Sequence, residues 1–144
     1  EERWQEIDYG DWDGMPIAQW RRLAADQFAR FREDLSALAP PNGEDYLSFK
    51  TRITAAWESL AGLPDGSHVL VVTHGGVLRV VLPKVLGMPL NRSFPLHIPF
   101  ACYSRVELVV ESLVERVVED AKERGGVKTS ASLIFHNGAA HRAG

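Results

Sequence analysis

The chain has 144 residues, which suits one domain with a core large enough to fold without disulfide bonds. Its formal net charge of -3 argues against a protein that works by binding nucleic acid or an anionic membrane surface, because such binding needs clustered lysine and arginine. The single cysteine excludes an internal disulfide, and no apolar run approaches the roughly 20 residues that cross a bilayer. We therefore expect a cytoplasmic globular domain.

The first fifteen residues are rich in acidic and aromatic side chains, with glycines at positions 10 and 14. Glycine and aspartate at this density indicate a short extended segment followed by a turn-rich loop. A carboxylate packed among aromatic rings can have a raised pKa, as a general acid requires near neutral pH. A solvated acidic loop accounts for the same residues without any chemistry, and the residue types alone favour that simpler interpretation.

Two helical regions are predicted next. Apolar residues at steps of three or four over 17–38 predict one long helix or a pair of helices, and a second stripe predicts a helix over 45–60. The stripe residues are Trp20, Ala24, Phe28, Phe31, Leu35 and Leu38 in the first region, and Tyr46, Phe49, Ile53, Trp57 and Leu60 in the second.

A strand, a histidine and two glycines form the most informative stretch of the sequence. Residues 68–73 contain a valine-rich apolar run without polar alternation, which predicts a parallel strand covered on both faces. His74 then lies at the carboxyl end of the strand, where open α/β sheets bind ligands. Gly75 and Gly76 open a helix that is predicted to run through residue 86, with a kink or an interruption at Pro83. The first N–H groups of that helix predict a phosphate or oxyanion site.

The C-terminal third predicts three more elements. Partial alternation over 101–110 indicates a strand, and residues 131–135 indicate a second, shorter strand. Between them, Ser112 and Glu115 match a capping box before an apolar stripe, so we expect a helix over 113–124.

The other reactive side chains give weaker signals. His68 and His74 lie roughly 20 Å apart along one strand and cannot share a metal ion. His136 and His141 have no cysteine or carboxylate cluster nearby in the sequence, so we expect no metal site. Cys102 falls in a strand pattern and suits a core position better than a nucleophile. A His-Gly-Gly segment also supplies oxyanion N–H groups in some esterases, but the Gly-x-Ser-x-Gly sequence of those enzymes does not occur here.

Four motifs in the right order resemble the histidine phosphatase superfamily, the phosphoglycerate mutase-like enzymes. They are Trp4-Gln5-Glu6, Gly10-Asp11-Trp12-Asp13-Gly14, Gly43-Glu44-Asp45 and the strand-His-Gly-Gly-helix stretch over 71–79. The similarity covers residues 3–110 and 133–140, and it is greatest to α-ribazole phosphatases and broad-specificity phosphatases.

The resemblance implies an α/β fold of three layers, α/β/α, with a mostly parallel sheet. It also implies hydrolysis of a small phosphorylated metabolite through a phosphohistidine, without a metal ion or other cofactor. In this pattern His74 binds the phosphoryl oxygens, Gly75 adds its backbone N–H, and Glu6 protonates the leaving oxygen. The loop that supports Glu6 contains Trp12, Asp13 and Gly14. Neither nucleic acid nor a membrane is an expected partner, and a homodimer remains open.

The sequence departs from the family pattern at its nucleophile. No Arg-His-Gly occurs in residues 1–144, although a histidine in that motif attacks phosphorus in the family. The strand at 68–73 also needs more neighbours than these residues supply, and the chain does not begin with methionine. We therefore expect 1–144 to be one partial domain, a C-terminal fragment that lacks the N-terminal strand and is inactive alone. Residues 111–130 are expected to be an insertion that relatives lack.

Two other functions stay open at this point. A non-catalytic relative that only binds phosphorylated ligands would retain His74 and the two glycines. A serine hydrolase would use the His-Gly-Gly segment as its oxyanion site. For Arg79, packing and an ion pair are better expectations than a phosphate contact.

Overall fold

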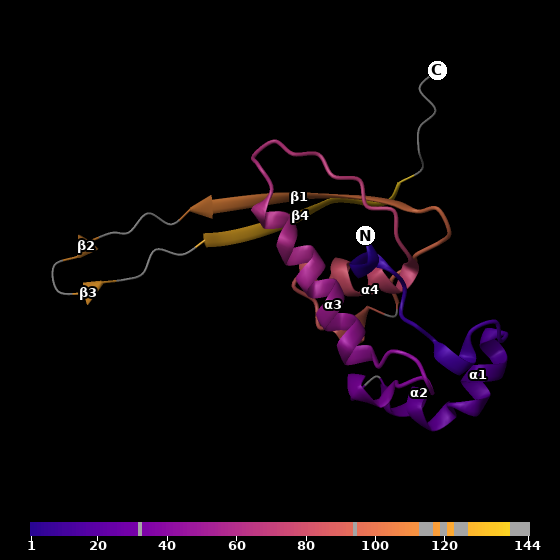
Figure 1. Cartoon of the computed structure of the whole chain (residues 1–144). Coiled ribbons are helices and arrows are strands. Elements are labelled where there is room, and N and C mark those ends of the chain that lie inside the picture. Colours follow the sequence, from indigo (N-terminus) through magenta and orange to yellow (C-terminus); the bar gives the residue numbers. More distant parts are fainter. Residues whose placement is uncertain (32, 94, 113–116, 119–120, 123–126, 139–144) are drawn as a thin grey trace, which may run out of the picture.

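The computed structural model describes residues 1–31, 33–93, 95–112, 117–118, 121–122 and 127–138. Its elements are α1 (Ile17–Leu23), α2 (Ala25–Phe31), α3 (Tyr46–Ser59), α4 (Gly75–Val85), β1 (Tyr103–Ser112), β2 (Val117–Val118), β3 (Ala121–Lys122) and β4 (Val127–Gly138). A long β-hairpin passes beside α4 and the C-terminal end of α3, while α1 and α2 lie near the N-terminal end of α3 (Figure 1). No helix in the described ranges is long and apolar enough to cross a membrane.

The core forms where α3 packs between α4 and the N-terminal helices. Phe49, Ile53 and Val77 are fully buried, so the predicted stripe of α3 faces inward. Asp45 begins α3 as its N-cap, and its carboxylate accepts hydrogen bonds from the backbone N–H groups of residues 47 and 48 at 3.0 Å each. The first predicted helical region is a pair, because the chain leaves helical geometry at Ala24. Both stripes are therefore confirmed.

The predicted strand at 68–73 does not form among the described residues. These residues belong to no helix or strand, and the side chains of Leu70 and Val72 are 77% and 86% exposed. A strand exists only when its N–H and C=O groups pair with a neighbour, and no described segment pairs with this one. The sheets that the described residues do form are both antiparallel, β1 with β4 and β2 with β3, in place of the expected parallel sheet.

The hairpin also corrects the helix expected over 113–124. Ser112 lies opposite Val127, and Val117 opposite Lys122, so β2 and β3 keep the register of β1 and β4. Pairing with β4, which lies later in the sequence, overrides the local capping signal, and valine suits a strand. The remaining residues of that predicted helix lie outside the described ranges. The predicted strands over 101–110 and 131–135 are confirmed within β1 and β4.

Helix α4 continues past Pro83 to Val85, so the expected interruption does not occur. Pro83 lies in the last turn of the helix, where the proline removes one helical hydrogen bond without breaking a longer ladder. The Leu86 N–H still donates to the Leu82 carbonyl at 3.0 Å, and Gly87 follows with φ +62°. A glycine after the helix end was expected, and its left-handed backbone confirms that role.

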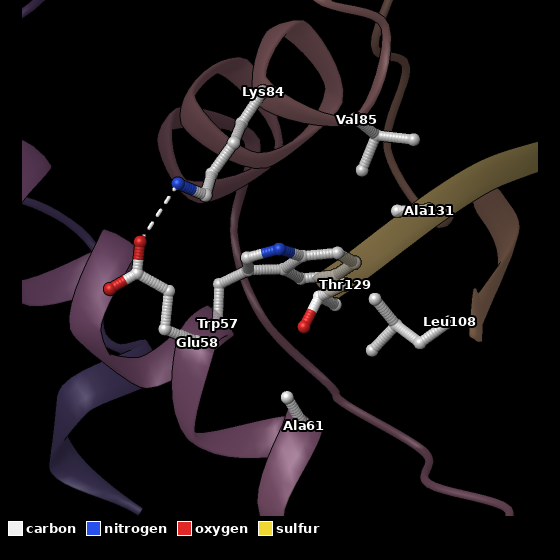
Figure 2. A pocket seen from close by; sticks show the side chains of 8 residues that line it. All are labelled: Trp57, Glu58, Ala61, Lys84, Val85, Leu108, Thr129 and Ala131. Atoms are coloured by element: carbon white, nitrogen blue, oxygen red, sulfur yellow. Dashed lines mark hydrogen bonds and ion pairs between the residues drawn. The ribbon is translucent and has the colours of Figure 1, made fainter. Parts of the chain in front are cut away.

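The hairpin meets α3 and α4 around a cavity of ≈ 450 Å³ (Figure 2). Its lining residues are Trp57, Glu58, Ala61, Lys84, Val85, Leu108, Thr129 and Ala131. The indole of Trp57 lies between the two helices and the strands, and Lys84 Nζ pairs with Glu58 Oε1 at 2.9 Å. None of the four motifs contributes to this lining, so the candidate site lies elsewhere.

Candidate functional site

Glu6 contacts the first turn of α4. Its Oε2 accepts a hydrogen bond from the Gly76 N–H at 2.9 Å, although the two residues are 70 positions apart. A Cβ built on Gly76 would lie 2.0 Å from Glu6 Oε1, so only glycine leaves room for the carboxylate. The next residue, Ile7, is 5% exposed and anchors the segment in the core. Glycine at 76 therefore permits the close approach of an acid to a helix N-terminus.

His74 lies at the same helix end. It is the N-cap of α4, with extended backbone at φ -121° and ψ 167°, and its side chain is exposed and caps no N–H group. The space around Gly75 is open, since the nearest atom to a Cβ there is Ile98 Cγ2 at 4.0 Å. An imidazole, a carboxylate and the N-terminal end of an eleven-residue helix thus share one corner of the fold. The partial positive charge of that helix end favours an anion.

A second bond joins the same two segments, two residues before Glu6 in one and three residues before Gly76 in the other. The Thr73 Oγ1 donates to the Trp4 carbonyl at 2.6 Å, 69 positions away in the sequence. This bond and the Glu6–Gly76 bond join the same two segments. Residues 4–6 therefore lie beside residues 73–76, where the chain enters α4. The segment after residue 68 therefore remains attached to the fold at its end, despite its exposed apolar side chains.

The loop of Trp12, Asp13 and Gly14, which was expected to support Glu6, is anchored by aromatic packing. Trp12 is 6% exposed and stacks on Trp20 of α1, with ring centroids 5.5 Å apart and an interplanar angle of 6°. Tyr9 packs against the same ring at 5.6 Å, and burial raises its pKa to about 12, with the charges of Glu6 and Asp13 adding to the effect. Tyr9 therefore carries no charge near neutral pH. Asp13 is exposed, as is Gly14 with φ +77°.

The glycine motifs at 10–14 and 43–45 lie against each other. The Asp11 N–H donates to the Pro41 carbonyl at 2.9 Å, and the Glu44 N–H donates to the Asp8 carbonyl at 2.8 Å. A Cβ on Gly10 would lie 2.3 Å from the Pro41 oxygen and 2.5 Å from the Gly43 nitrogen. Both glycines are thus required by backbone packing, a contact that the sequence did not reveal.

Replacing Gly10 with alanine is expected to destabilise the fold by about 2–4 kcal/mol. The added Cβ meets rigid backbone atoms, and the residue has a positive φ of +49°, which disfavours any side chain. Gly14→Ala is a matched control with φ +77° and nothing within 4 Å, so it isolates the backbone cost, about 1–2 kcal/mol. Urea unfolding of both variants measures the difference; equal losses would contradict the close packing.

Two arginines behave differently in the structure. Arg79 Nη1 donates to the Ser93 carbonyl at 2.8 Å, which agrees with the packing role expected for it. Arg52 pairs with Glu44 and reaches the backbone of the segment that carries Glu6. The sequence placed Arg52 on the helix that follows the Gly43 motif, but nothing in the sequence indicated a function for this side chain.

Comparison with known proteins places these residues in a family. The family model described as the histidine phosphatase superfamily (branch 1) matches residues 1–138. The adenosylcobalamin/α-ribazole phosphatase of Escherichia coli (strain K12) is 24% identical over 103 residues, which are 72% of this chain and 51% of that protein. The chain thus spans about half the length of the curated relatives it matches.

Solved structures agree with the sequence comparison. The structure of a putative α-ribazole-5'-P phosphatase from Escherichia coli has a TM-score of 0.64 at 21% identity, over 92% of this chain and 57% of that chain, and it supports the fold. YhfR of Bacillus stearothermophilus has a TM-score of 0.56 at 30% identity, over 67% of this chain and 48% of that chain. The phosphoglycerate mutase-like α/β fold is therefore supported, and the chain belongs to branch 1 of the histidine phosphatase superfamily.

Proposed function

We propose that this chain forms part of a phosphatase that hydrolyses a small phosphomonoester through a phosphohistidine intermediate. The observation that carries the proposal is the Glu6 carboxylate, held at 2.9 Å by the Gly76 N–H beside His74 at the start of α4. An acid, an imidazole and a helix N-terminus are the groups that protonate a leaving oxygen and hold a phosphoryl dianion. Family membership and the names of the relatives support the same activity.

His74 and Gly75 bind the phosphoryl group in this proposal. The exposed imidazole donates to a phosphoryl oxygen, and the Gly75 N–H, at the open helix end, contacts another. Charge on the equatorial oxygens persists in the in-line transition state, so donors already fixed in place stabilise that state. No metal ion or other cofactor takes part in the proposed reaction.

Glu6 acts as acid and then as base. In the first step a histidine nitrogen attacks phosphorus, the ester P–O bond breaks, and the leaving oxygen takes the proton of Glu6. In the second step Glu6 takes a proton from water, whose oxygen attacks phosphorus and releases inorganic phosphate and the free histidine. The loop of Trp12, Asp13 and Gly14 supports the segment that holds Glu6.

The attacking histidine lies outside residues 1–144 in this proposal. The family motif Arg-His-Gly does not occur here, and the exposed side chains of Val69, Leu70 and Val72 suit a strand that lacks its neighbours. We propose that residues 68–73 join a parallel sheet, covered by helices on both faces, whose other strands come from outside these residues. Residues 111–130 are proposed to be an insertion in the hairpin.

A second candidate is a protein that binds phosphorylated ligands without hydrolysing them. The exposed His74 side chain and the open space at Gly75 support it, because an imidazole and a helix end can bind a phosphate without a nucleophile. The two candidates differ in whether a covalent intermediate forms.

Trapping that intermediate tests the proposal. The full-length protein is mixed with 32P-labelled substrates, including α-ribazole 5'-phosphate, and quenched in alkali. We expect label on the protein that survives alkali and is lost in acid, as a phosphoramidate bond requires. Substrate binding without labelled protein would favour the binding protein instead, and labelling by a fluorophosphonate would favour a serine hydrolase.

A further inference from the structure

The segment that carries Glu6 has few backbone partners of its own. Residues 2–4 form a single 3-10 turn without a buried residue, and residues 5–9 belong to no helix or strand. An acid on such a segment needs a fixed main chain, because a shift of about 1 Å at a reacting group can cost 10²-fold in rate. The hydrogen bonds that the carbonyl groups of residues 3, 5 and 6 accept show which side chain fixes this main chain.

Those carbonyl groups accept hydrogen bonds from one side chain, Arg52 of α3. Its Nη1 donates to the Arg3 and Gln5 carbonyls at 3.0 and 3.1 Å, and its Nη2 donates to the Glu6 carbonyl at 3.4 Å. Its Nε and Nη2 donate to the two carboxylate oxygens of Glu44 at 2.9 and 2.6 Å. These contacts account for the five N–H groups of the guanidinium.

Glu44 and Phe49 fix the orientation of that guanidinium. The Arg52 and Glu44 side chains are only 25% and 19% exposed. Because two parallel hydrogen bonds join the guanidinium to the carboxylate, the guanidinium plane has one orientation. The guanidinium also lies over the Phe49 ring, 5.3 Å from its centroid. The hydrogen bond with Glu44 raises the pKa of Arg52 above its ordinary value, so the fork stays fully protonated. Arg52 and Glu44 therefore form a rigid clamp on the main chain of the Glu6 segment, and Arg52 joins this clamp to the core helix α3.

We propose that Arg52, oriented by Glu44, is a positioning residue that holds the main chain of Glu6 so that its carboxylate meets the Gly76 N–H. Within the part of the chain that the structure describes, the hydrogen bonds of Arg52 go to Glu44 and to the carbonyl oxygens of residues 2, 3, 5 and 6, none of which is a reacting atom, so Arg52 acts through Glu6. The catalytic meaning of this role rests on the proposed phosphatase function. Lysine cannot replace arginine here, because one ammonium group cannot reach both Glu44 and the four separate carbonyl oxygens.

The test combines a structural readout with a kinetic one. In 1H–15N spectra of this chain, we expect Arg52→Lys to move the Gly76 amide resonance, since the bond to Glu6 weakens. In the full-length protein, kcat for an alkyl phosphomonoester should fall by about 10–10²-fold, and less for p-nitrophenyl phosphate, whose leaving group needs little protonation. A change in the dependence on the leaving group is a signature that a purely structural role would not produce.

Lys84→Gln is the matched control. This substitution also removes an ion pair with a glutamate of α3 or next to it, because Lys84 Nζ lies 2.9 Å from Glu58 Oε1 of α3. The Lys84–Glu58 pair, however, lies at the cavity beside the hairpin and not at the Glu6 segment (Figure 2). We expect it to leave the Gly76 resonance and the leaving-group dependence unchanged. The proposal is overturned if Arg52→Lys behaves like this control or only lowers Tm.

A second variant covers the case in which Arg52→Lys does not fold. Glu44→Gln retains Arg52 but removes the charge that orients it, so the same two signatures should appear in a weaker form. Unchanged signatures in Glu44→Gln would then overturn the proposal. The shift of the Gly76 resonance can be measured without any enzymatic turnover. A failure of the proposed phosphatase function would therefore be seen separately, because the unmutated full-length protein would then hydrolyse no phosphomonoester.

Discussion

Replacing Glu6 with glutamine is expected to lower kcat of the proposed full-length phosphatase by about 10²–10⁴-fold, the range that a general acid contributes. Glutamine has nearly the shape of glutamate and retains an oxygen for the Gly76 N–H, but it cannot give up a proton. The loss should be larger for an alkyl phosphomonoester than for p-nitrophenyl phosphate, because an alkoxide leaves poorly without protonation. Steady-state kinetics with both substrates measure the difference.

Glu2→Gln is a suitable control, since Glu2 is an exposed acid on the preceding turn. It changes the net charge by the same amount and should leave kcat and the leaving-group dependence as they are. If Glu6→Gln raised KM and left kcat unchanged, Glu6 would contribute to binding alone. That result would support the phosphate-binding protein over the phosphatase.

Gly76→Ala is expected to reduce kcat by about 10²-fold or more while hardly changing stability. The new Cβ would lie 2.0 Å from Glu6 Oε1, and the flexible carboxylate can move away at low cost to folding. Alanine also favours a helix over glycine by about 1 kcal/mol, which offsets part of any strain. The acid is then present but displaced from the helix end. Kinetics and thermal unfolding of the same preparation separate the two effects.

Gly75→Ala is the matched structural control, because a Cβ there meets nothing closer than Ile98 Cγ2 at 4.0 Å. It should retain the Glu6–Gly76 bond, as the Gly76 amide resonance would show. The Glu6→Gln and Gly76→Ala double variant should be little worse than either single variant, since both act on the same acid. Fully multiplicative losses would mean that Gly76 contributes in some other way.

Local pattern was enough to predict α1 to α4 and parts of β1 and β4. The stripe of α3 predicted that Phe49 and Ile53 would face the core, and the structure buries both completely. This works because helical periodicity is a property of neighbouring residues. The same kind of signal was misleading at the capping box of Ser112, because strand pairing with residues later in the sequence determined the local structure there.

Contacts between distant residues could not be predicted from local pattern. The family resemblance proposed Glu6 and His74 as candidate site residues, but no periodicity in the sequence predicts that Glu6 contacts Gly76. The packing of Gly10 on Gly43 and the clamp of Arg52 on the Glu6 segment are likewise nonlocal. For residues 68–73 the composition predicted a strand, but a strand also requires a partner, and composition does not say where that partner lies.

The most direct test of the central claim is a turnover assay of the 144-residue chain with p-nitrophenyl phosphate. The claim is that residues 1–144 hold the acid Glu6 and the phosphoryl-binding His74, while the attacking histidine lies outside them. We predict no hydrolysis above the background of a His74→Ala variant prepared in parallel. Hydrolysis by the unmutated chain that is abolished in His74→Ala would contradict the claim, because these residues would then contain a complete active site.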